Sequence, residues 1–106
     1  MRWESTEHDG VGVLHVFGYL GRQDTHRFDG VVDWVRSRSD GRLVLDMSGL
    51  LGWSEEGEAA VLRAARSPLG VCGLLDRPAP LLTGDTTGRI RIYPNVRCAL
   101  ADLARA

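Results

Sequence analysis

Residues 43–62 read LVLDMSGLLGWSEEGEAAVL, and this stretch decides the fold of the chain. Its first three residues, 43–45, form an apolar run that is typical of a buried strand, and the letters DMSG follow at 46–49. A short apolar link at 50–53 leads to SEEG at 54–57, where a serine followed by acidic residues is typical of a helix start. The stretch therefore predicts a strand over 43–47 and a helix from Ser54 to about Arg66.

Upstream of this stretch, the sequence predicts a hairpin and a helix. Alternation is weak over residues 2–7 and clearer over 11–17, and the Asp9-Gly10 pair between the two runs is a common hairpin turn. Further on, Phe28, Val31, Val32 and Val35 fall at i, i+3, i+4 and i+7, which places them on one apolar stripe of a helix.

Downstream, residues 71–75 form another apolar run, which we expect to be a strand parallel to the central one because a helix connects them. A short helix over 77–83, a last strand over 89–93 and a final helix beginning at Pro94 complete the chain. The order β-β-α-β-α-β-α-β-α predicts one α/β domain, residues 1–106, in which helices pack on a mixed β-sheet with an N-terminal hairpin.

The composition of the chain argues against several classes of function, among them nucleic-acid binding and membrane insertion. The chain has 106 residues and a net charge of −1, so no strong field would attract nucleic acid or an acidic membrane surface. No apolar run approaches 18 residues and residues 2–10 are polar, so we expect no membrane insertion, no signal peptide and a cytoplasmic location. All thirteen basic residues are arginine, which excludes a Schiff-base or P-loop lysine.

Few residues offer catalytic or metal-binding chemistry. Cys72 and Cys98 are expected to be reduced and buried, with a disulfide or redox role as the alternative. The spacing of the three histidines fits no metal motif. A triad built on Ser54 lacks the Gly-x-Ser-x-Gly elbow, so the sequence predicts neither an enzyme nor a cofactor.

Four segments together resemble the STAS family, the domain shared by sulfate transporters and anti-sigma-factor antagonists. They are GYL at 18–20, LVLDMSG at 43–49, VCGLL at 71–75, and IYPN at 92–95 followed by Ala99-Leu100. The chain departs from the family at two places. Gly21 stands where the family usually has Asp, and Glu56 stands where it carries a phosphorylatable Ser or Thr directly before a glycine.

The resemblance implies a STAS-type fold and a module that binds a protein partner, either an anti-sigma factor or a related serine-kinase-like regulator. The partner surface implied is the helix start with the link before it: Ser48, Trp53, Ser54, Glu55, Glu56, Gly57 and Ala60. Glu56 supplies a permanent charge near the positive end of the helix, where a phosphoserine would bring about −1.5 to −2 charges. We therefore expect no phosphorylation at the usual site, and Glu56 suggests either a regulator fixed in one state or a different partner.

Several alternatives stay open at this point. The acidic residues after Ser54 are also what an ordinary solvated helix cap requires. Trp53 is either an interface anchor or a buried staple against the first turns of the helix. The second function considered is an accessory subunit of an ABC-type membrane transporter, because STAS-like single domains can dock on the ATPase subunit of such systems. The oligomeric state is left undetermined.

Overall fold

The computed structural model describes residues 1–75 and 77–103, and its order of elements is the one that the sequence predicts. A 3-10 turn over Arg22–Asp24 precedes α1. The elements are β1 (Arg2–His8), β2 (Val11–Leu20), α1 (Thr25–Ser37), β3 (Arg42–Trp53), α2 (Glu55–Ala64), β4 (Leu69–Cys72), α3 (Pro80–Thr83), β5 (Ile90–Tyr93) and α4 (Val96–Leu103).

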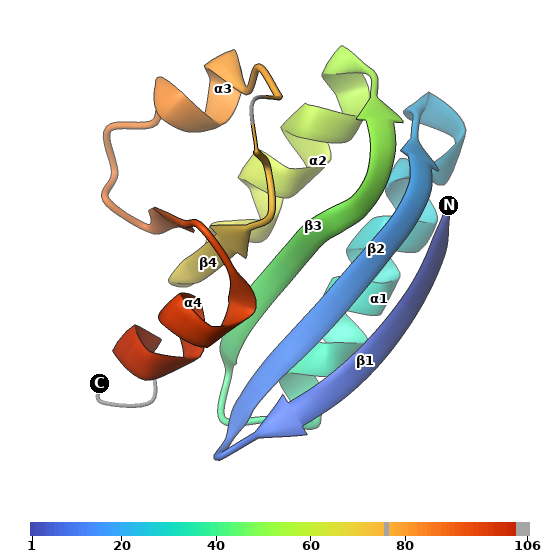
Figure 1. Ribbon diagram of the computed structural model, residues 1–106. Helices are drawn as coiled ribbons and strands as arrows, with labels where there is room; N and C mark the ends of the chain where they lie inside the picture. The colour runs from blue at the N-terminus through green and yellow to red at the C-terminus, as the bar shows by residue number, and fades with distance from the viewer. Residues whose placement is uncertain (76, 104–106) are drawn as a thin grey trace.

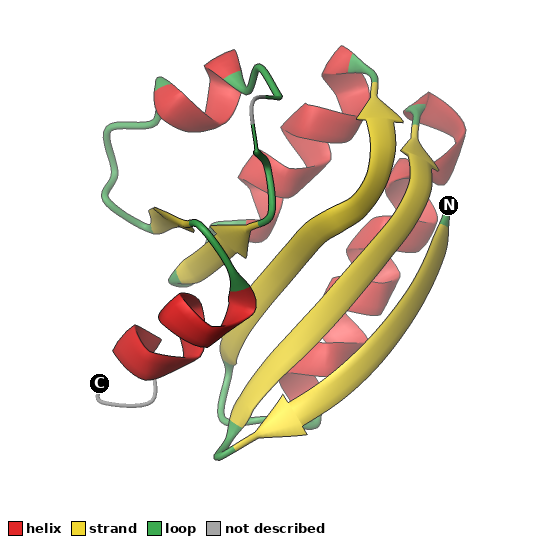
Figure 2. Ribbon diagram, viewed as in Figure 1, coloured by secondary structure: helices red, strands yellow, loops and turns green. Residues whose placement is uncertain are grey.

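The five strands form one mixed sheet in the order β1-β2-β3-β4-β5. The β1–β2 hairpin is antiparallel, whereas the other three neighbouring pairs are parallel, as predicted for β4. Helices α1 and α2 lie together on one face of the sheet, and α4 lies on the opposite face (Figures 1 and 2). The predicted α/β fold, with an N-terminal hairpin and helices packed on a mixed sheet, is confirmed.

Strand alternation divides the core between the two faces, because successive side chains of a strand point to opposite sides. The larger cluster lies under α1 and α2 and includes the predicted stripe of Phe28, Val31, Val32 and Val35. The smaller cluster lies under α4 and consists of Val11, Val13, Val44, Cys72, Ala99 and Leu103. Because α4 is short, it covers only part of its face (Figure 1).

Several predicted boundaries were wrong: β2 continues to Leu20 instead of ending at Phe17, and α3 begins at Pro80 rather than at Arg77. Strand β3 continues to Trp53 instead of ending at Met47, because β2 keeps pairing with it through two register shifts. Strand β4 spans Leu69–Cys72 rather than 71–75, since pairing with β3 begins at Leu69. Helix α4 begins at Val96 rather than Pro94, and the side chain of Asn95 accepts a hydrogen bond from the backbone N–H of Cys98, as an N-cap residue does.

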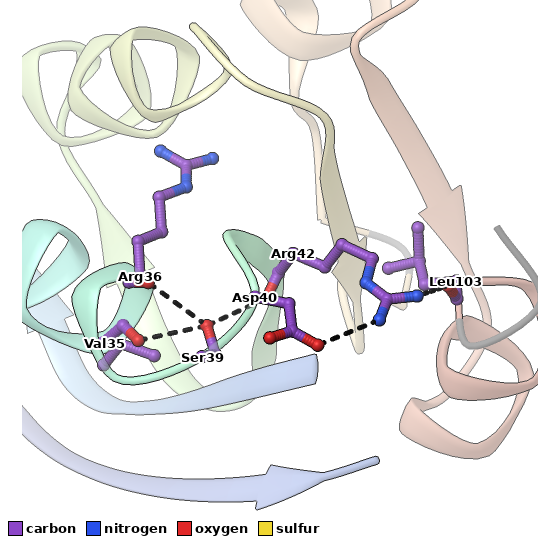
Figure 3. Close-up of polar contacts among 6 residues, drawn as sticks. All are labelled: Val35, Arg36, Ser39, Asp40, Arg42 and Leu103. Carbon is purple, nitrogen blue, oxygen red and sulfur yellow. Dashed lines mark hydrogen bonds and ion pairs between the residues drawn. The ribbon is translucent and has the colours of Figure 1, made fainter. Parts of the chain in front are cut away.

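A polar junction joins α1, β3 and α4 at one end of the sheet (Figure 3). The Ser39 hydroxyl donates to the carbonyl oxygen of Val35 over 3.2 Å, which satisfies an end carbonyl of α1. The guanidinium of Arg42 donates to the carbonyl oxygen of Leu103 over 2.9 Å and lies 3.5 Å from a carboxylate oxygen of Asp40. Arg42 therefore attaches the last turn of α4 to the start of β3.

Candidate functional site

The DMSG segment holds its shape through the carboxylate of Asp46. One oxygen accepts the backbone N–H of Ser48 over 3.0 Å, and the other lies 2.8 Å from Nδ1 of His15 on β2. Burial would raise the pKa of Asp46, but the hydrogen bonds from Ser48 and His15 outweigh it and leave that pKa below its ordinary value. Nothing in the sequence motif indicated His15, which only the β2–β3 register brings alongside Asp46.

The segment that the sequence presented as a link is the last part of β3. Its glycines leave space for aromatic rings of β2: a Cβ on Gly49 would lie 2.4 Å from the ring of Phe17, and one on Gly52 would lie 3.3 Å from that of Tyr19. Leu51, beside a register shift, is 85% exposed. The rings of β2 therefore lie against the glycine backbone, and the end of β3 reaches the start of α2.

The start of α2 combines an ordinary N-cap with a close backbone approach. The hydroxyl of Ser54 accepts the backbone N–H of Gly57 over 3.1 Å, and the backbone N–H of Ser54 donates to the carbonyl oxygen of Leu20 over 3.1 Å. A Cβ on Gly57 would lie 2.1 Å from that same oxygen of Leu20. The glycine after Glu56 is thus required by the contact between α2 and the end of β2.

The predicted partner surface divides into an accessible part and a buried part. Ser48, Glu55 and Glu56 are exposed, and Trp53 and Ser54 are half-buried. Gly57 and Ala60 were wrongly included, because both face the sheet and are buried, Ala60 completely. The carboxylate of Glu56 therefore lies at the helix start without cover from other side chains.

Glu58, in contrast to Glu55 and Glu56, is buried and does not add to the surface charge. Its side chain is 4% exposed, and one carboxylate oxygen accepts the backbone N–H groups of Leu81 over 2.9 Å and of Leu82 over 3.3 Å. These are first-turn donors of α3, which have no partner within their own helix. Glu58 thus links α2 to α3.

A groove of about 510 Å³ lies between the start of α2 and the segment leading into α3. Its lining is mainly apolar and includes Trp53, Pro78, Pro80 and Leu81, with Glu55 beside them. The guanidinium of Arg77 lines the same groove and donates to the carbonyl oxygen of Leu50. The contribution of α3 to this groove was not predicted from the sequence, because only the folded chain brings residues 77–81 beside the start of α2.

The two cysteines differ in environment. Cys72 is buried under α4, as predicted, and burial together with the charge of Asp46 raises the pKa of its thiol to about 12. Cys98 was wrongly expected to be buried: it lies in the first turn of α4 on the side away from the sheet and is exposed.

Comparison with protein-family models and with curated proteins gives no match. Solved structures do match. An anti-sigma factor antagonist from Mycobacterium paratuberculosis is 23% identical, with a TM-score of 0.78 over 99% of this chain and 94% of that one. A putative anti-sigma factor antagonist from Thermotoga maritima is 13% identical, with a TM-score of 0.80 over 98% and 95%.

A third match is the murine Solute Carrier 26 family member A9 anion transporter, at 16% identity and a TM-score of 0.70. It covers 94% of this chain but only 18% of the transporter chain. The chain thus has the fold of anti-sigma factor antagonists, a fold that also occurs as a small part of a transporter. Within residues 1–75 and 77–103, no helix has the length and apolar character needed to cross a membrane.

Proposed function

We propose that this chain is a protein–protein interaction module of the anti-sigma-factor antagonist type, which binds an anti-sigma factor or a related kinase-like regulator. The observation that carries the proposal is the start of α2, where Ser54 caps the helix, Gly57 contacts the Leu20 carbonyl, and the carboxylate of Glu56 is exposed. The local structure suits a docking surface, and its accessible part is Ser48, Trp53, Ser54, Glu55 and Glu56.

Glu56 determines how binding at this surface would be regulated. A helix N-terminus carries roughly half a positive charge and favours an anion, whether carboxylate or phosphate. A serine kinase does not phosphorylate a carboxylate as it does a serine hydroxyl. The carboxylate also has a smaller negative charge than a phosphoserine, which has about −1.5 to −2. We infer that recognition persists at this surface without phosphorylation at the usual position.

The groove beside the start of α2 supports the same surface as the place where a partner binds. Trp53 and Leu81 offer apolar contacts in a groove that the exposed Glu55 also lines, and the exposed Glu56 follows Glu55 directly in the chain. Aromatic side chains flanked by polar groups are common at the centre of protein interfaces. Trp53 packs on the core with part of its ring and lines the groove with the rest, so it can serve both as a staple and as an anchor.

The first test is co-purification from a native lysate with wild-type protein and with the Glu55→Arg/Glu56→Arg variant, followed by mass spectrometry. The proposal expects a soluble ATP-binding protein of the anti-sigma kinase class with the wild type and its loss with the variant. Glu7→Arg, on the distant strand β1, is the matched control and should retain the partner. A membrane transporter ATPase in its place would favour the accessory-subunit alternative.

The second test uses that kinase with ATP and intact-mass analysis. Wild-type protein should gain no phosphate on residues 54–57, whereas Glu56→Ser should gain one, because the substitution supplies the missing hydroxyl at the helix start. A phosphate on Ser54 of the wild type would contradict the proposed loss of phosphorylation. Calorimetry would then compare how tightly the two proteins bind the kinase.

A further inference from the structure

Strand β1 forms an open edge of the sheet (Figures 1 and 2). All seven of its residues pair with β2 on one side. On the other side, no backbone hydrogen bond joins β1 to another element within the part of the chain that the structure describes. Such an edge presents unpaired N–H and C=O groups to which a strand of another chain can add.

The side chains at the start of β1 are self-complementary in an antiparallel pairing. Arg2 and Glu4 lie on the face opposite α1 and α2 and are exposed, whereas Trp3 between them packs on the helix side. If Trp3 of one copy lies opposite Trp3 of a second copy, each Arg2 lies opposite Glu4 of that second copy. Neither Arg2 nor Glu4 forms an ion pair among the described residues of its own chain, although the guanidinium of Arg2 lies over the ring of Phe17, 5.9 Å from its centroid.

The same charges discriminate among the three registers centred on residues 2, 3 and 4. Side chains along a strand alternate between the two faces of the sheet. In a two-fold symmetric antiparallel pair, residues of the same face lie opposite each other only when the symmetry axis passes through a residue position. The register can therefore change only by moving the axis from one residue to the next. Centring the pair on Arg2 places two arginines opposite each other, and centring it on Glu4 places two glutamates opposite each other. Like charges directly opposite destabilise a strand pair, whereas opposite charges stabilise it. Of these three registers, the one centred on Trp3 is attractive.

The helix side of this edge also suits a second copy. The rings of Trp3 and Trp34 meet edge to face with centroids 5.7 Å apart, and Trp34 is still 44% exposed. A hollow of about 400 Å³ opens at the same end of β1, and residues from both faces of the sheet line it: Arg2, Trp3, Glu4, Phe17 and Arg27. In the pairing centred on Trp3, the two copies bring their tryptophans together and each places charged side chains at the hollow of the other.

We propose that β1 is a homodimer interface, in which two copies pair antiparallel about Trp3 and join their sheets into one. The contact is isologous, as most two-fold interfaces are, because the same residues contribute from both copies. It lies on β1, whereas the proposed partner surface lies at the end of β3 and the start of α2. The dimer therefore does not depend on the proposed function.

Charge reversal tests the pairing directly. Sedimentation equilibrium would compare wild type, Arg2→Glu, Glu4→Arg and the double variant Arg2→Glu/Glu4→Arg, from about 1 µM to about 1 mM, a range that suits a short strand contact. Each single reversal should weaken dimerisation by about tenfold or more, because it places like charges opposite each other twice. The double variant should return to within about threefold of wild type, since it restores both ion pairs with their signs exchanged.

Glu7→Arg changes the charge of the same strand outside these pairs and should dimerise like the wild type. Circular dichroism would show that each variant is folded. Hydrogen exchange of the wild type adds a readout that needs no substitution: amides of residues 2–4 should become more protected as concentration rises. A monomeric wild type at the highest concentration, a dimer indifferent to both single reversals, or a folded double variant that stays monomeric would each overturn the proposal.

Discussion

Gly57 lies where the start of α2 packs directly against the end of β2. A Cβ at this position would lie 2.1 Å from the carbonyl oxygen of Leu20, and a backbone atom cannot rotate aside as a flexible side chain can. Gly57→Ala should therefore lower the free energy of unfolding by about 1–3 kcal/mol, the usual cost of an added group in a filled space. Urea denaturation of the two proteins measures the difference.

Gly30 provides the matched control for that substitution. It lies within α1, and a Cβ there would meet no atom within 4 Å. Gly30→Ala should stabilise the protein by about 0.5–1 kcal/mol, because alanine loses less conformational freedom than glycine in a helix interior. Equal effects of the two substitutions would show that helix propensity, rather than the contact with Leu20, decides the role of Gly57.

Individual residues of the candidate site were predictable to the extent that local spacing decides them. Ser54 as a cap follows from the acidic residues after it, and the cap is observed. The contacts of Gly57 and Glu58 were not predictable in the same way. They involve the carbonyl oxygen of Leu20 and the backbone N–H group of Leu81, which lie far from them in the sequence and reach α2 only in the folded chain.

Among the elements, α3 depends most on a contact outside itself. It has four residues, too few for a helix to be stable alone, and its first-turn N–H groups at Leu81 and Leu82 donate to the carboxylate of Glu58. Glu58→Ala should leave these groups without a partner and lower the free energy of unfolding by about 1–3 kcal/mol. Hydrogen exchange should show loss of protection at residues 81 and 82 before the sheet exchanges.

Glu56→Ala is the control for this element, because it removes an exposed carboxylate from the same helix start. Its effect on the free energy of unfolding should stay within about 0.5 kcal/mol, and exchange at residues 81 and 82 should match the wild type. If hydrogen exchange at residues 81 and 82 were unchanged in the Glu58→Ala variant, apolar contacts rather than the Glu58 carboxylate would hold α3 against α2.

The elements themselves were largely predictable, since their apolar patterns have a clear period. The end of β3 was not, because a sequence with two glycines in four residues, 49–52, is typical of a turn. In the fold these glycines make room for Phe17 and Tyr19, whose rings come from a strand paired only in three dimensions. A glycine that signals flexibility locally can therefore mark a place where another strand comes close.

Over the whole molecule, the two faces of the sheet are covered unequally. Helices α1 and α2 cover one face, whereas α4 alone covers part of the other, over Val13, Val44 and Cys72 (Figure 1). The proposed partner surface lies at the far end of β3 from the junction where Arg42 holds α4. Loosening α4 should therefore expose the sheet beneath it without disturbing the start of α2.

Leu103→Ala tests this separation, with the thiol of Cys72 as the reporter. Leu103 is 5% exposed in the cluster that covers Cys72, so its truncation should cost about 2–5 kcal/mol of unfolding free energy. In the wild type, a thiol reagent at pH 8 should modify Cys98 quickly and Cys72 slowly, because burial hides Cys72 and raises its pKa to about 12, and the thiolate is the reacting form. The variant should react quickly at both cysteines while keeping its partner.

Leu51→Ala is the control for this experiment. Its side chain is 85% exposed, so the substitution should leave the reaction of both cysteines unchanged. Slow modification of Cys72 in a destabilised Leu103 variant would mean that α4 comes off only when the whole sheet unfolds.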